Sequence, residues 1–371
     1  MKTIKILKNT IFALVILSCG FYSSCKDEGE TYDALSVTKV STVLDRKVGV
    51  NTAELAQFVI VQGTGLNAVT SILVNDVSVD LKEAFITSNE ITFQVPRVIP
   101  IEINNLITVK TETSQATLPI EVNVPTFLVA GMYNEYTPKG KTMKIVGDFF
   151  DLYQITTEAG EVFFGDEKVT VTEATGTSIS FVVPSGAADE AKVKLVSPVC
   201  GEVMVPGKYR ERGNMLIDFD PFTGWGGGRY VSDGPTPEPI SGSYSHFKLA
   251  RGDAGDWAWA DETAIAMVGL DYWPDVTANP QNYLLKFEAC TLLPLTKRQI
   301  RFYFSQINYN WEPFASGLAF STNGEWQTVS ISLDEVWNDE VPNDGVVQIL
   351  GNSYAEDTDI SFDNIRIVKK D

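Results

Sequence analysis

Apolar and polar positions alternate along most of the chain in short runs of β-branched residues, each ended by turn-forming residues. Between residues 37 and 124, such runs lie at 58–61, 72–74 and 91–95, and glycine, asparagine or proline follows each of them. Runs of this length, separated by turn chemistry, are typical of strands in a β-sandwich. The pattern therefore predicts a β-sandwich for residues 37–124.

The same order of runs returns between residues 125 and 208, at 143–146, 162–164 and 180–183. A run that ends in glycine precedes one that ends in Val-Pro, at Val95-Pro96 and again at Val183-Pro184. Superposing the two Val-Pro pairs brings the preceding glycine turns into near register, which a chance match would not do. We predict tandem domains at 37–124 and 125–208, which resemble immunoglobulin-like IPT/TIG domains. Neither contains Trp or His, so we interpret both as spacers.

From residue 209 to residue 371 the composition shifts to Trp, Tyr, Gly and Asn, and all seven tryptophans fall here. Strand candidates follow one another without a convincing long helix, at 215–219, 247–250, 265–268, 283–288, 300–304, 327–333, 346–350 and 360–368. This spacing suits a jelly-roll-like β-sandwich. Period two places Phe302 on one face, with Arg301 and Tyr303 on the other, which is a candidate binding floor.

The N-terminal 24 residues have the pattern of a signal peptide, since lysines precede an apolar run at 11–17 that is too short to span a bilayer. Ser23-Ser24 before Cys25, and Lys26-Asp27-Glu28 after it, resemble a lipoprotein cleavage site with the acidic export signal of Bacteroidota. We predict lipidation at Cys25, a tether over residues 25–36 and a surface-exposed location on the outer membrane. Cys19 is the competing lipidation site, and a soluble secreted protein is the alternative.

The net charge and the small number of histidine and cysteine residues exclude several classes of function. The formal net charge of −19 disfavours nucleic acid, anionic lipid and acidic polysaccharides as partners, so a neutral partner is expected. The single histidine, His246, has no partnered Ser or Cys motif, which argues against a catalytic triad. Cys200 and Cys290 are expected to be buried free thiols. The sequence predicts no cofactor and no metal. Asp218, Asp220 and Asp363 are possible calcium ligands, but their pattern is only a weak indication of a calcium site.

Paired aromatic residues are the strongest candidate for a binding site. Successive side chains of an extended backbone point to opposite faces, so at least one of Tyr272 and Trp273 is expected to be exposed. A rigid, flat side chain with a polar edge suits a sugar ring. The full set of candidate glycan contacts is Tyr272, Trp273, Trp311, Trp257, Trp225, Arg251 and Asn308.

For several tryptophans the sequence leaves more than one role open. Trp257 and Trp259 share a face. They form either one wall of a binding groove or part of the core. Trp225 lies among glycines. It belongs either to a lid over the ligand or to an exposed turn. Trp326 is interpreted as structural because it starts a strand, and Trp337 is unassigned.

Residues 324–331 and 359–367 resemble strands of jelly-roll carbohydrate-binding modules. With the tandem IPT/TIG-like repeat and the lipoprotein signal, the whole chain resembles surface glycan-binding proteins of Bacteroidota polysaccharide-utilisation systems, of the type with a C-terminal xyloglucan-binding domain. Tyr272-Trp273 match the paired aromatics of such domains.

The resemblance implies a non-catalytic lipoprotein that captures a neutral plant polysaccharide, such as a β-glucan or a xyloglucan-like chain, and works with an outer-membrane transporter complex. The alternatives are an adhesin-like surface stalk and a polysaccharide hydrolase. We also expect the segment from residue 209 onward to fold and bind alone.

Overall fold

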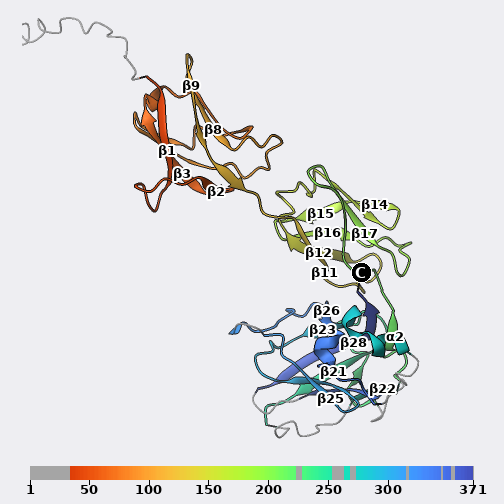
Figure 1. The fold of residues 1–371 in the computed structure, drawn as a ribbon. Helices are drawn as coiled ribbons and strands as arrows, with labels where there is room; N and C mark the ends of the chain where they lie inside the picture. Colours follow the sequence, from red (N-terminus) through yellow and green to blue (C-terminus); the bar gives the residue numbers. More distant parts are fainter. Residues whose placement is uncertain are drawn as a thin grey trace, which may run out of the picture. The chain divides into compact units, whose positions relative to one another are not determined.

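The computed structural model describes residues 34–222, 228–252, 263–267, 273–314, 317–343, 346–351 and 356–370. These residues form mostly antiparallel β-sheets with a few short helical turns, so the predicted all-β class is confirmed (Figure 1). The chain divides into two compact units, Met1–Val124 and Pro125–Asp371. None of the described helices is long and apolar enough to cross a membrane.

The first unit is a sandwich of two four-stranded sheets. Its main strands are β1 (Ser36–Thr42), β3 (Phe58–Thr64), β4 (Ser71–Val74), β5 (Val77–Ser78), β6 (Phe85–Ile86), β7 (Glu90–Gln94), β8 (Leu106–Lys110) and β9 (Gln115–Pro119). They pair in the orders β1-β3-β7-β6 and β5-β4-β8-β9. A parallel pair of β2 (Thr52–Glu54) with β10 (Glu121–Asn123) and the 3-10 turn η1 (Leu66–Ala68) complete the unit. Val59, Val61 and Phe93 lie in its core.

Residues 125–208 form a second sandwich with the same topology. Its strands are β11 (Leu128–Met132), β12 (Thr142–Asp148), β13 (Glu161–Phe164), β14 (Glu167–Val169), β15 (Val171–Ala174), β16 (Ser178–Val182), β17 (Val193–Ser197) and β18 (Gly201–Met204). The orders β11-β12-β16-β15 and β14-β13-β17-β18 repeat those of the first sandwich strand for strand. Val95 and Val183, which follow equivalent strands, are both buried. The predicted tandem repeat is therefore a repeat of structure.

The glycine shared by the two repeats has a steric cause. A Cβ atom on Gly63 would lie 1.9 Å from the carbonyl oxygen of Ser36, and one on Gly147 would lie 2.1 Å from that of Leu128. In each case the neighbouring strand approaches at a point where the pairing register shifts. Only glycine leaves room for this approach, which explains why both runs end in glycine.

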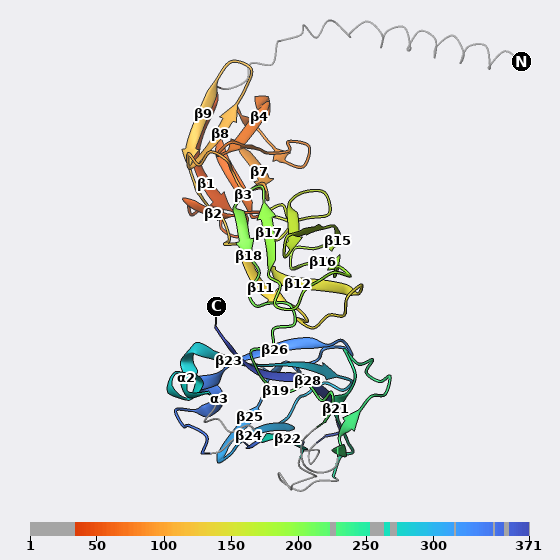
Figure 2. The same ribbon diagram turned by 90° about the vertical axis from the view of Figure 1, so that its right-hand side faces the viewer.

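The C-terminal sandwich, residues 209–370, has a six-stranded and a four-stranded sheet. Its strands are β19 (Asn214–Ile217), β20 (Val231–Ser232), β21 (Tyr244–Leu249), β22 (Thr263–Met267), β23 (Tyr283–Thr291), β24 (Ile300–Phe304), β25 (Ile307–Trp311), β26 (Gln327–Ser332), β27 (Val346–Gly351) and β28 (Thr358–Lys369). The six-stranded sheet has the order β20-β21-β28-β23-β26, with β19 also paired to β28, and the four-stranded sheet has the order β22-β27-β24-β25. Figure 2 shows the two sheets as separate layers.

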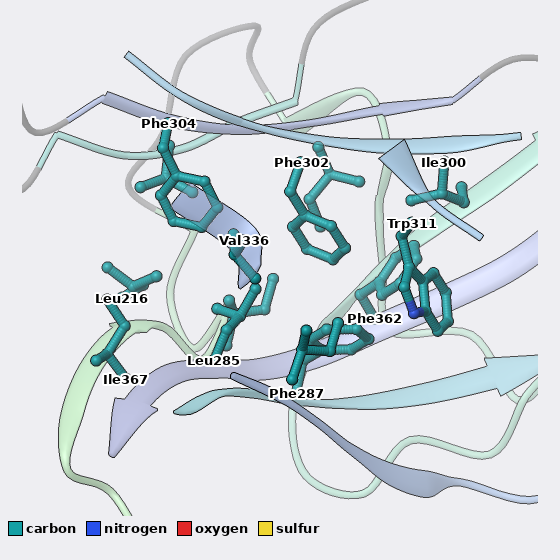
Figure 3. Packing of buried hydrophobic residues seen from close by; sticks show 14 of the residues in the cluster. Leu216, Leu285, Phe287, Ile300, Phe302, Phe304, Trp311, Val336, Phe362 and Ile367 are labelled. Carbon is teal, nitrogen blue, oxygen red and sulfur yellow. The ribbon is translucent and has the colours of Figure 1, made fainter. Parts of the chain in front are cut away.

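Short helical turns lie beside these sheets, at α2 (Pro274–Ala278), η4 (Pro280–Asn282) and α3 (Leu333–Trp337). The eight strands expected in this segment are present, and β20 and β25 are additional. Aromatic residues from both sheets fill the space between them, among them Phe287, Phe302 and Phe362 (Figure 3).

The outer face of the six-stranded sheet carries charged residues and is covered by the second sandwich. On β23, Lys286 and Glu288 alternate with the core residues Leu285 and Phe287, so they point away from the core. All the same, Lys286 is 4% exposed and Glu288 is 0% exposed. Burial on both faces of a strand requires a second layer of protein over the charged face.

Glu135 of the second sandwich supplies a negative charge that balances Lys286 and Arg366 on this face. Its carboxylate accepts from Lys286 Nζ at 2.8 Å and from Arg366 Nη2 at 2.7 Å, while Arg366 Nη1 donates to Glu288 Oε2 at 2.9 Å. Glu211 accepts a further bond from Lys286 Nζ at 3.0 Å. We call these five residues the buried charge cluster. Glu135 lies in the loop between β11 and β12 and is nevertheless only 4% exposed.

The two described cysteines are free, and one of them differs from the expectation. Cys290 is buried in β23, but Cys200 is exposed at the turn between β17 and β18. A turn at the end of a two-stranded hairpin has no second layer to cover it, so the predicted burial of Cys200 is wrong.

Asp363, in β28, is predicted to make stability depend on pH. Burial, and next the Glu288 carboxylate, raise the pKa of Asp363 well above its usual value, and its Oδ2 has no hydrogen-bond partner. Burial also raises the pKa of Glu288 to about 7, against the attraction of Arg366. A raised carboxyl pKa means that the folded protein holds a proton that the unfolded chain releases. Stability is therefore greatest below the ordinary carboxyl pKa and falls as pH rises through the raised values.

Asp363→Asn should reduce this fall, because the amide mimics the protonated acid and does not ionise. Urea unfolding of parent and variant at about pH 5 and about pH 8 measures the difference, and the Glu288 contribution should remain in both. Asp166→Asn, at the exposed turn between β13 and β14, is the matched control. Equal pH dependence in parent and Asp363→Asn would show that Asp363 is ionised in the fold.

Candidate functional site

The strand β25 decides where the candidate residues around Trp311 point. Its sequence, Ile-Asn-Tyr-Asn-Trp, alternates apolar and polar positions, and it pairs antiparallel with β24. Period two therefore places Ile307 and Trp311 toward the core, and Asn308 on the opposite face. Trp311 is 3% exposed, and its ring lies edge to face with Phe287 at 5.2 Å and with Phe362 at 5.9 Å between ring centroids (Figure 3). The prediction that Trp311 contacts sugar is wrong, because it is a core residue.

The outward residues of β24 and β25 form a polar surface with one aromatic side chain. Arg301 lies opposite Asn310, and Tyr303 lies opposite Asn308. The Arg301 guanidinium donates from Nε to Asn310 Oδ1 at 2.8 Å and from Nη1 to Asn308 Oδ1 at 3.4 Å. We call Arg301, Tyr303, Asn308 and Asn310 the open face. The cation holds both amides in place beside the tyrosine.

Exposure on this sheet increases toward the edge strand β25. Gln348 and Leu350 of β27 point to the same side as Tyr303 and Arg301, but they are 5% and 6% exposed. Asn308 is exposed, and Tyr303 and Arg301 are half-buried. The open face therefore lies on β24 and β25. A half-exposed ring flanked by amides and a guanidinium can stack on a pyranose ring and donate hydrogen bonds to its hydroxyls.

Trp273 lies at a different place, immediately before α2. Pro274 begins that helix, and the Trp273 carbonyl accepts from Thr277 N at 3.2 Å. Its side chain is half-buried and packs against the core of the C-terminal sandwich. The indole is thus held by the core on one side and leaves part of its surface in solvent. The prediction that Trp273 contacts sugar therefore remains a prediction.

Several predicted contacts lie outside the described residues. They are Tyr272, Trp257 and Trp225, together with Trp259 and the predicted lipidation site Cys25. The segments 253–262 and 268–272, which carry Trp257 and Tyr272, adjoin the two ends of β22 in the chain. β22 belongs to the same sheet as the open face.

Asp218 and Asp220, two of the three carboxylates considered for calcium, accept hydrogen bonds from nearby protein groups. Asp218 accepts from Arg212 Nη2 at 3.1 Å, and Asp220 accepts from Ser243 N at 2.6 Å. Within the described ranges, no group of three or more His, Cys, Asp or Glu residues is arranged to hold a metal ion. His246 Nε2 lies 2.8 Å from Asp359 Oδ1, so the single histidine is paired with a carboxylate.

Residues 209–369 match the family model described as the surface glycan-binding protein B xyloglucan binding domain. The match spans the C-terminal sandwich and supports glycan capture by this domain. The comparison with curated proteins gives no match.

Solved structures of surface glycan-binding proteins B share the fold of almost the whole chain. PbSGBP-B from Prevotella bryantii is 18% identical with a TM-score of 0.54, over 91% of this chain and 99% of that chain. The surface glycan-binding protein B from a complex xyloglucan utilization locus in Bacteroides uniformis is 17% identical with a TM-score of 0.50, over 90% and 99% of the two chains. At this identity the likeness establishes the fold.

The candidate residues that the structure describes lie at different places on the C-terminal sandwich. Asn308 joins the open face, while Arg251 is exposed at the turn after β21, where its backbone N donates to Asp357 Oδ1 at 2.6 Å. Trp326 is structural as interpreted, since it is 9% exposed and its Nε1 donates to Glu238 O at 2.8 Å. Trp337, which had no assigned role, is a core residue at 0% exposure.

Asn310 is a functional candidate that the set of predicted glycan contacts did not include. The signal that identifies it is the strict alternation of residues 307–311, which places Asn308 and Asn310 on one face.

Proposed function

We propose that the C-terminal sandwich captures a neutral β-linked glucan of the xyloglucan type on the open face, and that the protein performs no catalysis. The observation that carries this proposal is the contrast between the two outer faces of the sandwich. The six-stranded sheet is covered through the buried charge cluster, whereas the four-stranded sheet keeps Tyr303 and Asn308 accessible. A glycan chain needs an accessible surface, and the open face has the exposed Asn308 beside the partly buried Tyr303.

Aromatic residues that neighbour β22 along the chain extend the proposed platform. Trp273 follows the segment that leaves β22, and Tyr272 and Trp257 lie on the adjoining segments. We propose that these three residues and Tyr303 stack on successive sugar rings, and that Asn308 and Arg251 bond hydroxyl groups. Trp225 is proposed as a lid over the ligand. The acidic character of the chain, with a net charge of −19, favours an uncharged polysaccharide.

Affinity electrophoresis against a panel of neutral and acidic polysaccharides tests the proposal. We expect retention by xyloglucan, weaker retention by unbranched β-glucans, and none by polygalacturonate. Because stacking and neutral hydrogen bonds carry the binding, retention should change little between low and moderate salt. No reducing sugar should appear after prolonged incubation with xyloglucan. Release of oligosaccharides would support a hydrolase, and no retention by any neutral glycan would refute the proposal.

We also propose that a lipid on Cys25 holds the protein at the outer face of the outer membrane, where it passes glycan to a transporter complex. The serines before Cys25 and the Lys-Asp-Glu after it support this assignment. Cys25→Ala should abolish labelling by a radioactive fatty acid, and persistent labelling would implicate Cys19. Chemical cross-linking on intact cells, followed by mass spectrometry, should recover an outer-membrane transporter with the parent protein.

A further inference from the structure

A groove at the junction of the second and C-terminal sandwiches has the features of a second binding site. Its cavity volume is about 560 Å³, within the range of small-molecule sites in proteins. Tyr133, Lys144 and Glu173 line it from the second sandwich. Glu238 and Glu325 line it from the C-terminal sandwich. We call this cavity the junction groove.

The backbone and the apolar contacts around the junction groove hold its two walls together. Thr328 N donates to the Tyr133 carbonyl at 2.8 Å, and Glu135 N donates to Thr328 Oγ1 at 2.8 Å. Tyr136 of the second sandwich packs with Ile240 and Trp326 of the C-terminal sandwich in a small apolar cluster. The groove is therefore formed before any ligand arrives, so that a ligand would not have to order it.

The lining combines one aromatic ring with polar groups of both signs. Tyr133 is half-buried, and Lys144 Nζ lies 5.0 Å from the centroid of its ring. Lys144 Nζ lies 3.8 Å from Glu325 Oε2, and Lys141 Nζ lies 3.7 Å from Glu238 Oε1. All four of these charged side chains are largely exposed, and such pairs cost little to rearrange.

The charges in the junction groove select the ligand class. The lysines Lys141 and Lys144 face the carboxylates of Glu173, Glu238 and Glu325. An anion would meet an excess of carboxylates in a chain of net charge −19. An uncharged polyhydroxylated ligand can accept from the ammonium groups, donate to the carboxylates and lay a ring face against Tyr133.

We propose that the junction groove is a second contact site for the same neutral glycan, an assignment that rests on the proposed function of the open face. The groove lies on the side of the C-terminal sandwich that contacts the second sandwich, and the open face lies on the other sheet. One protein can therefore hold two stretches of polysaccharide. Avidity then raises the affinity for polymer above that for short oligosaccharides.

Hydrogen exchange of the full chain, with and without xyloglucan oligosaccharides, locates the contacts. Slower exchange is expected in residues 133–144 and 322–326, as well as in residues 300–311. Residues 161–169, in the far sheet of the second sandwich, are the internal control. Protection confined to 300–311 would overturn the second site and leave the proposed function intact. Protection in no segment would contradict the proposed function itself.

Variants provide a second, independent readout by affinity electrophoresis on xyloglucan polymer. In a Tyr303→Ala background, Tyr133→Ala should weaken the residual binding by about tenfold, the usual effect of losing one stacking ring. Lys144→Ala should weaken it by a smaller factor. Lys168→Ala, an exposed lysine on β14, is the matched control and should leave it unchanged. Residual binding that is equal in all four proteins would overturn the second site, and the thermal transition of each variant establishes that it is folded.

Discussion

Replacing Arg366 by methionine is expected to lower the free energy of unfolding of residues 125–371 by about 3–5 kcal/mol. Arg366 is 0% exposed and pairs with Glu288 in its own sandwich and with Glu135 in the preceding one. Methionine preserves most of the side-chain volume but leaves Glu288 buried without its cation, while Glu135 keeps only Lys286. Urea unfolding followed by tryptophan fluorescence reports on this unit, since all seven tryptophans lie after residue 208.

Two further variants separate the loss of charge pairing from a general loss of packing. Arg366→Met combined with Glu288→Gln removes one stranded charge and should recover part of the lost stability. Arg298→Met breaks the exposed Arg298–Glu312 pair of the same unit and should cost less than about 1 kcal/mol. An Arg366→Met protein as stable as its parent would mean that the buried charge cluster does not hold the two sandwiches together.

The same cluster changes the fragment that should be isolated. The segment from residue 209 onward was expected to fold alone, but without the second sandwich Lys286 and Arg366 lose Glu135, and the charged face of β23 is uncovered. We therefore expect the fragment 125–371 to unfold in one cooperative transition. The fragment 209–371 should melt at a lower temperature than 125–371, and equal melting temperatures would contradict this expectation.

Replacing Tyr303 by alanine is expected to weaken xyloglucan binding by about 1–3 kcal/mol, which corresponds to roughly 5- to 150-fold in affinity. The ring is the aromatic member of the open face, and alanine removes its stacking surface while the core residues Phe302 and Phe304 keep their positions. Isothermal titration with oligosaccharides measures the change. Tyr303→Phe keeps the ring and should retain most of the affinity. Trp273→Ala tests the second proposed ring in the same way.

Trp311 is the contrasting residue. Since it is buried among Phe287, Phe302 and Phe362, Trp311→Ala should cost stability, by about 3–5 kcal/mol, with little selective effect on binding by the protein that remains folded. An unchanged affinity in Tyr303→Ala, together with a lost affinity in folded Trp311→Ala, would refute the open face as the binding surface.

The sequence by itself determined the features that depend on neighbours along the chain. Period-two runs separated by turn residues predicted the all-β class, the tandem repeat and eight strands of the C-terminal sandwich. The recurring glycine was visible as well, because a close approach of strands excludes every side chain at that position. Local steric preferences act over a few residues, so a single sequence displays them.

One local feature was missed although the sequence contained it. Residues 307–311 alternate apolar and polar side chains, but they were not among the predicted strands. Asparagine is uncommon in strands, and pairing with β24 outweighs that preference here. The error reversed the side of Trp311: a loop would have exposed it, whereas the strand buries it.

Only the tertiary structure decided which faces are covered and which charges meet. Glu135 and Arg366 are 231 residues apart in the chain, and no local pattern relates a carboxylate after β11 to a guanidinium in β28. Whether the polar side of a strand meets water or another domain depends on how complete domains pack, since alternation marks two faces without saying what lies against each. The charged side of β23 thus became an interface between two sandwiches, and the polar side of β24 and β25 remained open to a ligand.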